Sequence, residues 1–151
     1  MIATLSRTER SRHMGKIRSF GNASTEMTFA KLLRKHGLTG WRRHAAIPGR
    51  PDFYFPTKKL AIFLDGCFWH GCPQHFRMPE SNVAWWKSKM TANKRRDWRS
   101  SRNLRSRGIR VIRIWEHDLR PRFQESVIRR IQRLLAESVC TSPSRGGRRP
   151  T

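Results

Sequence analysis

One segment of the chain reads Leu60-Ala-Ile-Phe-Leu-Asp65-Gly-Cys-Phe-Trp-His70-Gly-Cys-Pro-Gln-His75 and joins an apolar run to a cluster of reactive side chains. Residues 60–64 show no polar alternation, which predicts a buried strand near the centre of a sheet. The cysteines, histidines and aromatic residues that follow would then lie in a loop at the end of this strand. Loops in that position commonly carry the functional groups of α/β proteins.

The hydrophobic pattern predicts further elements on both sides of this strand. We expect a helix over residues 24–37, strands over 41–46 and 52–55, a helix over 82–107, a strand over 109–115 and a helix over 124–137. Ser24 or Thr25 would cap the first helix and Asn82 the second, and Met27 would face inward. Because strands and helices are interspersed, we expect an α/β fold with a mixed central sheet flanked by helices.

The chain is short and strongly basic. Its 151 residues fit one domain, and 33 Lys and Arg against 10 Asp and Glu give a net charge of +23. The tail after residue 140 carries three of the arginines, Arg145, Arg148 and Arg149, so +20 remains on the rest of the chain. Such a charge requires a polyanionic partner, which indicates nucleic acid.

The division of the chain follows from its composition. Residues 1–23 are basic and lack an apolar period, so we expect an N-terminal arm that contacts DNA. Residues 24–140 would form the folded domain, and residues 141–151, rich in Ser, Pro, Gly and Arg, a disordered tail. The longest apolar run is about five residues, far below the roughly 18 of a membrane span, so we expect a cytoplasmic protein without a membrane partner.

The spacing Cys67-x4-Cys72-x2-His75 indicates a metal site. Zinc prefers thiolate and imidazole ligands in a tetrahedron, and closely spaced ligands on a loop supply part of such a set. His117, just beyond the strand expected to end at Trp115, is the favoured fourth ligand, with Cys140 as the alternative. The competing interpretation is two buried free cysteines and a surface histidine.

Three acidic residues stand out because acidic residues are scarce in this chain. Asp52, Asp65 and Glu26 could bind magnesium, which neutralises a phosphate and activates water for phosphodiester hydrolysis. Each could instead form a structural salt bridge, Asp52 with Arg50 for example. His70 could act as a general acid or base, or could be a zinc ligand, and the sequence leaves both roles open.

Aromatic and basic residues alternate around the cysteine loop. Phe68, Trp69 and Trp86 could enter between DNA bases, although core packing is the competing interpretation, above all for Trp86. The helix over 82–107 has a basic face suited to phosphate contact, formed by Lys87, Lys89, Lys94, Arg95, Arg96, Arg99, Arg102, Arg105 and Arg107.

Four motifs together resemble the very short patch repair (Vsr) endonuclease family within the restriction-endonuclease-like fold. They are residues 10–18 of the arm, Pro48-Gly-Arg-Pro-Asp-Phe53, Gly66-Cys-Phe-Trp-His70 and Trp115-Glu116. The resemblance covers most of the chain, and the second and third motifs are highly specific. It implies a magnesium-dependent, strand-specific enzyme that nicks double-stranded DNA at T:G mismatches left by deamination of 5-methylcytosine.

The resemblance also implies roles for the residues singled out above. Asp52 and the backbone carbonyl of Leu64 would bind magnesium, His70 would act in acid or base catalysis, and Glu26 would assist through the metal-bound water. Phe68, Trp69 and Trp86 would insert into DNA, Lys89 and Arg96 would bind it, and a structural zinc would be held by Cys67, Cys72, His75 and His117. We expect a monomer, with other mismatch-repair proteins as further partners.

Some positions depart from the family pattern. Leu64-Asp65 stands where some relatives have Thr-His, so Asp65 could bind metal itself, as the second acid does in the wider fold. Cys67 occupies the place of the usual lysine of that fold, which shifts the catalytic burden to His70. Two other functions stay open: a restriction-type endonuclease on unmismatched DNA, and a non-catalytic zinc-containing DNA-binding module.

Overall fold

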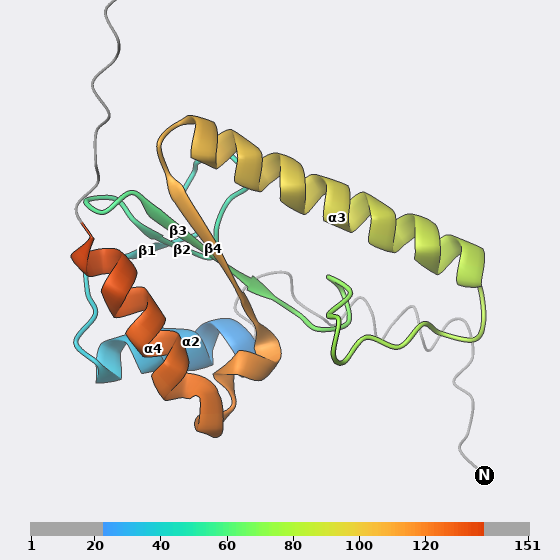
Figure 1. Cartoon of the computed structure of the whole chain (residues 1–151), viewed down its shortest axis with the longest axis horizontal. Coiled ribbons are helices and arrows are strands. Elements are labelled where there is room, and N and C mark those ends of the chain that lie inside the picture. The colour runs from blue at the N-terminus through green and yellow to red at the C-terminus, as the bar shows by residue number, and fades with distance from the viewer. Residues whose placement is uncertain (1–22, 138–151) are drawn as a thin grey trace, which may run out of the picture.

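Four strands form one mixed sheet in the computed structural model, which describes residues 23–137 (Figure 1). The strands are β1 (Arg42–Arg43), β2 (Phe53–Phe55), β3 (Leu60–Asp65) and β4 (Arg110–Trp115), and they lie in this order across the sheet. β1, β2 and β3 pair antiparallel, whereas β3 and β4 pair parallel. The predicted arm, the tail and Cys140 lie outside the described residues, apart from Ala23.

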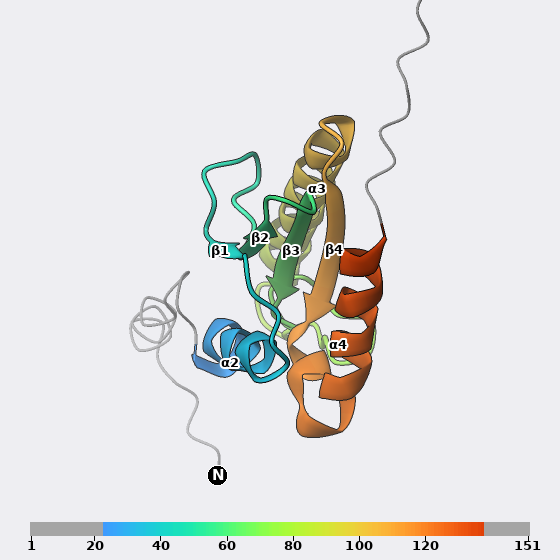
Figure 2. The same cartoon turned by 90° about the vertical axis from the view of Figure 1, so that its left-hand side faces the viewer.

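Helices cover both faces of this sheet. The chain begins with a π-helical turn (Ala23–Met27) that continues into α2 (Thr28–Lys35), and α3 (Val83–Ser106) links β3 to β4. A 3-10 helix (Glu116–Leu119) and α4 (Pro121–Ala136) complete the described part. Figures 1 and 2 show α3 along one side of the sheet and α2 with α4 on the other.

The alternation of side chains in β3 builds a core on each face. Leu60 and Ile62 pack in the larger cluster with residues of α2 and α4, and Ala61 and Phe63 pack in the smaller one with Leu104 of α3. Because both faces of β3 are covered, its run of apolar residues is the run expected of a central strand. The prediction of a single α/β domain with a mixed sheet flanked by helices is confirmed.

Several element boundaries differ from the prediction for local reasons. β1 has two residues where six were expected, because His44 adopts a left-handed backbone with φ of 48°. α4 begins three residues early at Pro121, since proline fits the first position of a helix.

Two predictions about the first helix are wrong. Ser24 and Thr25 lie within the π-helical turn instead of capping a helix, and Met27 is 39% exposed instead of facing inward. Asn82 occupies the N-cap position of α3 as expected, but its side chain makes no capping hydrogen bond. Among the described residues no helix is long and apolar enough to cross a membrane.

The parallel register of β3 and β4 places the two segments that follow these strands side by side. Asp65, the last residue of β3, pairs with Trp115, the last residue of β4. The cysteine loop after β3 therefore lies against the 3-10 helix after β4, and ligands from both segments can meet.

Candidate active site and metal centre

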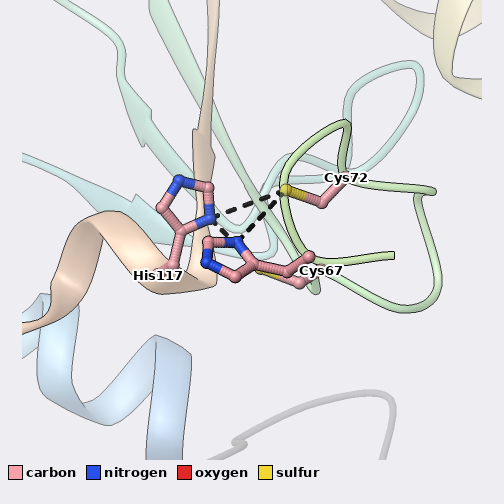
Figure 3. A group of neighbouring side chains, drawn as sticks. Cys67, Cys72 and His117 are labelled. Atoms are coloured by element: carbon pink, nitrogen blue, oxygen red, sulfur yellow. Dashed lines mark hydrogen bonds between the residues drawn. The ribbon is translucent and has the colours of Figure 1, made fainter. Parts of the chain in front are cut away.

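Two cysteines and two histidines converge where these segments meet (Figure 3). Their ligand atoms all lie within 4.8 Å of one another, with Cys67 Sγ 3.2 Å from His117 Nδ1. Cys72 Sγ lies 3.6 Å from His75 Nδ1 and 3.7 Å from His117 Nδ1. Sulfur and nitrogen ligands of one tetrahedral zinc are roughly 3.5 Å apart, so this set fits such an ion.

The titration of two of these side chains follows from their surroundings. Burial raises the pKa of the Cys67 thiol, and the neighbouring Cys72 raises it further. Desolvation lowers the pKa of His75, and the neighbouring His117 and Arg120 lower it further. His75 is therefore held in the neutral form that binds metals.

A second group of ligand atoms joins Glu26, His44 and Asp52, again within 4.8 Å of one another. Glu26 Oε2 lies 2.5 Å from Arg43 Nη2 and 3.0 Å from His44 Nε2. Asp52 Oδ2 accepts a hydrogen bond of 2.7 Å from the backbone amide of Leu64. The π-helical turn, the end of β1 and the start of β2 thus supply one carboxylate–imidazole group.

Burial raises the pKa of Asp52 more than any other influence on this group. The hydrogen bond from Leu64 opposes this shift, and the negative charge of nearby Glu26 adds to it. Two carboxylates held close together away from water are destabilised when both are ionised, and a bound cation offsets that repulsion.

His70 lies apart from the cysteine–histidine group and belongs to a network of two carboxylates and an arginine. His70 Nδ1 lies 2.6 Å from Asp97 Oδ2 and 3.7 Å from Asp65 Oδ1. Arg113 donates to both oxygens of Asp65, at 2.6 Å each, and lies 3.2 Å from Asp97 Oδ1. Asp65 is therefore engaged by Arg113 and is not part of the Glu26 group.

The pKa of Asp97 is shifted by opposing influences. Burial raises this pKa, but the hydrogen bond and charge of His70, together with the charge of Arg113, lower it below its ordinary value. Asp97 therefore stays ionised at neutral pH and can fix the orientation of the His70 ring.

Asp52 and the network around His70 face one cavity of about 460 Å³. Asp52, Leu64, Asp65, His70, Asp97 and Arg113 line it together with Gly49, Arg50, Phe63, Arg96 and Ser100. The cavity thus joins a candidate cation-binding carboxylate to a candidate acid or base. This pairing suits hydrolysis of a phosphodiester.

Aromatic side chains of the loop after β3 pack on an aromatic side chain of α3. The ring centroid of Phe68 lies 5.3 Å from that of Trp69 and 5.1 Å from that of Trp86. These three rings are half-buried and belong to neither core cluster of the sheet. Asn93 donates to the carbonyl of Trp69 at 2.8 Å and so ties the loop to α3.

The basic side chains predicted to contact DNA lie on α3. Lys89 and Arg96 are both exposed, and Arg96 also lines the cavity. α3 therefore carries positive charge from the aromatic cluster to the cavity.

Three residues of the site were missed by the sequence analysis. His44 stands opposite Asp52 once the predicted strands are paired, and this register was the available signal. Asp97 is the only acidic residue of α3. The scarcity of acidic residues, which drew attention to Asp52, could also have identified Asp97. Arg113 interrupts an otherwise apolar stretch of β4, but nothing local identified its partner.

The sequence is similar to one family of proteins, by its family profile and by an individual member alike. The sequence profile of the family described as DNA mismatch endonuclease Vsr matches residues 3–75. The DNA mismatch endonuclease Vsr of Escherichia coli is 37% identical over 114 residues, which cover 75% of this chain and 72% of that protein.

Two nicking enzymes are also similar. The type II nicking enzyme V.XorIIP of Xanthomonas oryzae is 35% identical over 74% of this chain and 82% of its own length. The type II nicking enzyme V.NaeI of Lentzea aerocolonigenes is 45% identical, but the match covers 46% of this chain and 42% of that protein.

Proposed function

The chain belongs to the Vsr family of DNA mismatch endonucleases, and we propose that it nicks one strand of double-stranded DNA at a T:G mismatch. Membership in the family makes it a DNA endonuclease. The mismatch, its origin in deamination of 5-methylcytosine and the use of magnesium are the proposed part.

One observation carries the proposal. Asp52 and the His70–Asp97 pair line the same cavity. Arg96 of α3 also lines that cavity, and His70 directly follows Phe68 and Trp69 of the aromatic cluster in the chain. A DNA-binding module without catalysis needs the charge and the aromatic rings but has no need of a half-buried carboxylate that lines the same cavity as an oriented imidazole.

Asp52 and the backbone carbonyl of Leu64 would hold the catalytic magnesium, and Glu26 would hold water bound to it. When bound, this ion neutralises charge on the scissile phosphate and favours ionisation of the attacking water. Support comes from the donor chemistry, since oxygen ligands suit magnesium, and from the proximity of Glu26 to Asp52.

His70 would move the proton. Asp97 accepts from Nδ1, which leaves Nε2 as the nitrogen that exchanges a proton with water or the leaving oxygen. Asp65 would contribute to catalysis from its place 3.7 Å from this ring. Direct metal binding by Asp65 would require it to give up its pair with Arg113.

A structural zinc held by Cys67, Cys72, His75 and His117 would fix the loop against the 3-10 helix. This anchoring would present Phe68, Trp69 and Trp86 for insertion between bases, while Lys89 and Arg96 bind phosphates. The mixed sheet with catalytic groups on neighbouring strands also supports the restriction-endonuclease-like fold, and we propose a monomer that acts on DNA inside the cell.

Nicking of a duplex with one T:G mismatch by the purified protein tests the proposal. The wild-type protein should nick one strand when magnesium is present, and folded Asp52→Ala and His70→Ala variants should lose about 100-fold or more in rate. A folded Asp52→Ala variant that nicks at the wild-type rate would sink the mechanism.

Nicking of unmismatched DNA is a second candidate, because two relatives are named type II nicking enzymes. Comparing matched and T:G duplexes of otherwise identical sequence separates the candidates. Equal rates on both duplexes would favour the second candidate. Salt-sensitive binding without magnesium-dependent nicking would instead indicate a non-catalytic module.

A further inference from the structure

His44 brings a nitrogen ligand to a group that would otherwise offer only carboxylate oxygen. Its Nε2 lies 3.0 Å from Glu26 Oε2. The ligand atoms of His44, Glu26 and Asp52 all lie within 4.8 Å of one another. Glu26 is buried and Asp52 is half-buried. An imidazole beside two carboxylates is a donor set suited to a divalent cation.

The backbone places His44 beside Asp52 in two ways. Arg43 of β1 pairs with Phe53 of β2, so His44, the residue directly after β1, stands opposite Asp52, the residue directly before β2. The amide of His44 donates to the carbonyl of Asp52 at 3.3 Å. His44 also has a φ of 48°, a left-handed backbone conformation that residues other than glycine rarely adopt.

The separations fit ligands of a single ion. Ligands about 2.1 Å from an octahedral ion lie about 3.0 Å apart when adjacent and about 4.2 Å apart when opposite. The 3.0 Å between His44 and Glu26 matches an adjacent pair. No two of the three ligand atoms are more than 4.8 Å apart. This limit exceeds the roughly 4.2 Å expected of opposite ligands by a distance that rotation of the side chains can close.

We propose that His44 Nε2 is a direct ligand of the cation bound at Asp52, and that this imidazole makes the site bind divalent transition metals more tightly than magnesium. The inference rests on the proposed function, because it concerns the same site. Magnesium binds mainly oxygen ligands, whereas transition metals gain from a nitrogen donor. Magnesium would then be accepted by the site but held more weakly than manganese.

Arg43 shares Glu26 with His44. Its Nη2 lies 2.5 Å from the same Oε2 atom that faces His44, so the guanidinium supplies the positive charge beside this buried carboxylate. A bound cation supplies equivalent charge, and Arg43 and the cation therefore compete for Glu26.

Electron paramagnetic resonance of Mn²⁺ tests the inference on the full-length, zinc-loaded protein. Spin-echo modulation from a directly bound imidazole nitrogen should be present in the wild type and lost in His44→Gln, which keeps a side chain of similar reach. The Mn²⁺ dissociation constant should rise at least about tenfold in His44→Gln, and that for Mg²⁺ should change less.

His36→Gln is the matched control, because His36 also faces a glutamate, Glu125 at 3.7 Å, but belongs to neither candidate metal group. It should keep both the nitrogen modulation and the Mn²⁺ affinity. His70→Ala should also keep the modulation, which would exclude the histidine that lines the cavity as its source.

Two results would overturn the inference: wild-type Mn²⁺ without nitrogen modulation, or modulation that persists in His44→Gln. If His44→Gln does not fold, His44→Ala replaces it, and the wild-type spectrum still decides the first result. Mn²⁺ binding by an Asp52→Ala variant shows whether only this inference fails or the proposed catalytic metal site fails as well. Binding that depends on Asp52 but lacks nitrogen modulation removes only the role of His44, whereas binding independent of Asp52 removes the proposed catalytic metal site.

Discussion

Asp52 is held in a position that disfavours its charged form. Burial raises its pKa first, the hydrogen bond from Leu64 opposes this, and nearby Glu26 raises it again. A carboxylate kept partly from water binds a cation well but weakens the folded state when no cation is present.

Asp52→Asn should therefore raise the free energy of unfolding at neutral pH without divalent cations. The pKa of Asp52 is higher in the folded state than its ordinary 3.8, so ionisation above that value lowers the stability of the wild type. The difference should disappear as the pH falls below 3.8, where the carboxyl is protonated in both states. Urea denaturation at neutral and acid pH measures it, and an equal gain at both would contradict this account.

At the scale of elements, the sequence predicts the central strand and the meeting of the cysteines with the histidines. β3 is apolar on both faces, and its parallel pairing with β4 brings His117 to Cys67 and Cys72 as the position after Trp115 suggested. These features are local or follow from one strand pair, so the pattern of residues is enough to predict them.

Other residues of the site depend on tertiary packing that the sequence does not display. His44 reaches Glu26 because its backbone is left-handed, and Asp97 reaches His70 because α3 packs against β3. Arg113 occupies a polar position of β4 whose partner, Asp65, lies on the neighbouring strand. The periodicity of the sequence predicts that such residues point away from the core, but it does not predict which side chains they contact.

The zinc proposed for the cysteine–histidine group would stabilise the loop between β3 and α3. The wild type should contain about one zinc per chain, and Cys67→Ser should lose it together with thermal stability, because metal binding contributes to folding. Elemental analysis and thermal unfolding measure both changes. A zinc content that is unaffected by Cys67→Ser, or no zinc in the wild type, would remove the proposed zinc site.

The aromatic cluster gives α3 two kinds of tryptophan. Trp86 packs on Phe68, whereas Trp98 is 61% exposed further along the helix, beside Arg102. Trp86→Ala should weaken binding to a T:G duplex about tenfold, since base stacking contributes roughly 1–3 kcal/mol per base. Trp98→Ala is the matched control and should have a smaller effect. Fluorescence anisotropy at fixed salt measures both, and equal losses would argue against a special role for the cluster.

At the scale of the whole molecule, charge dominates the expected interaction with DNA. The chain carries +23, and part of this charge lies on the long helix α3, where Lys89 and Arg96 are exposed and Arg96 also lines the cavity. Affinity should therefore fall steeply with salt, because each phosphate contact releases counterions.

Removing one of these contacts should change the salt dependence by a defined amount. Lys89→Gln and Arg96→Gln should each reduce the slope of log affinity against log salt by about 1, with similar losses on matched and mismatched duplexes. Binding measured over a series of salt concentrations gives the slope. Unchanged slopes in both variants would show that these side chains do not contact phosphates.

We expect DNA to be nicked at a T:G mismatch in the one cavity that Asp52 and the His70–Asp97 pair line together. The most direct test follows both strands of two duplexes that differ only in one base pair, T:G or C:G, incubated with the wild-type protein and magnesium. The account predicts a nick beside the mismatched thymine, on its strand alone, and little cleavage of the matched duplex. Equal cleavage of the two duplexes, or nicks on the guanine strand, would contradict it.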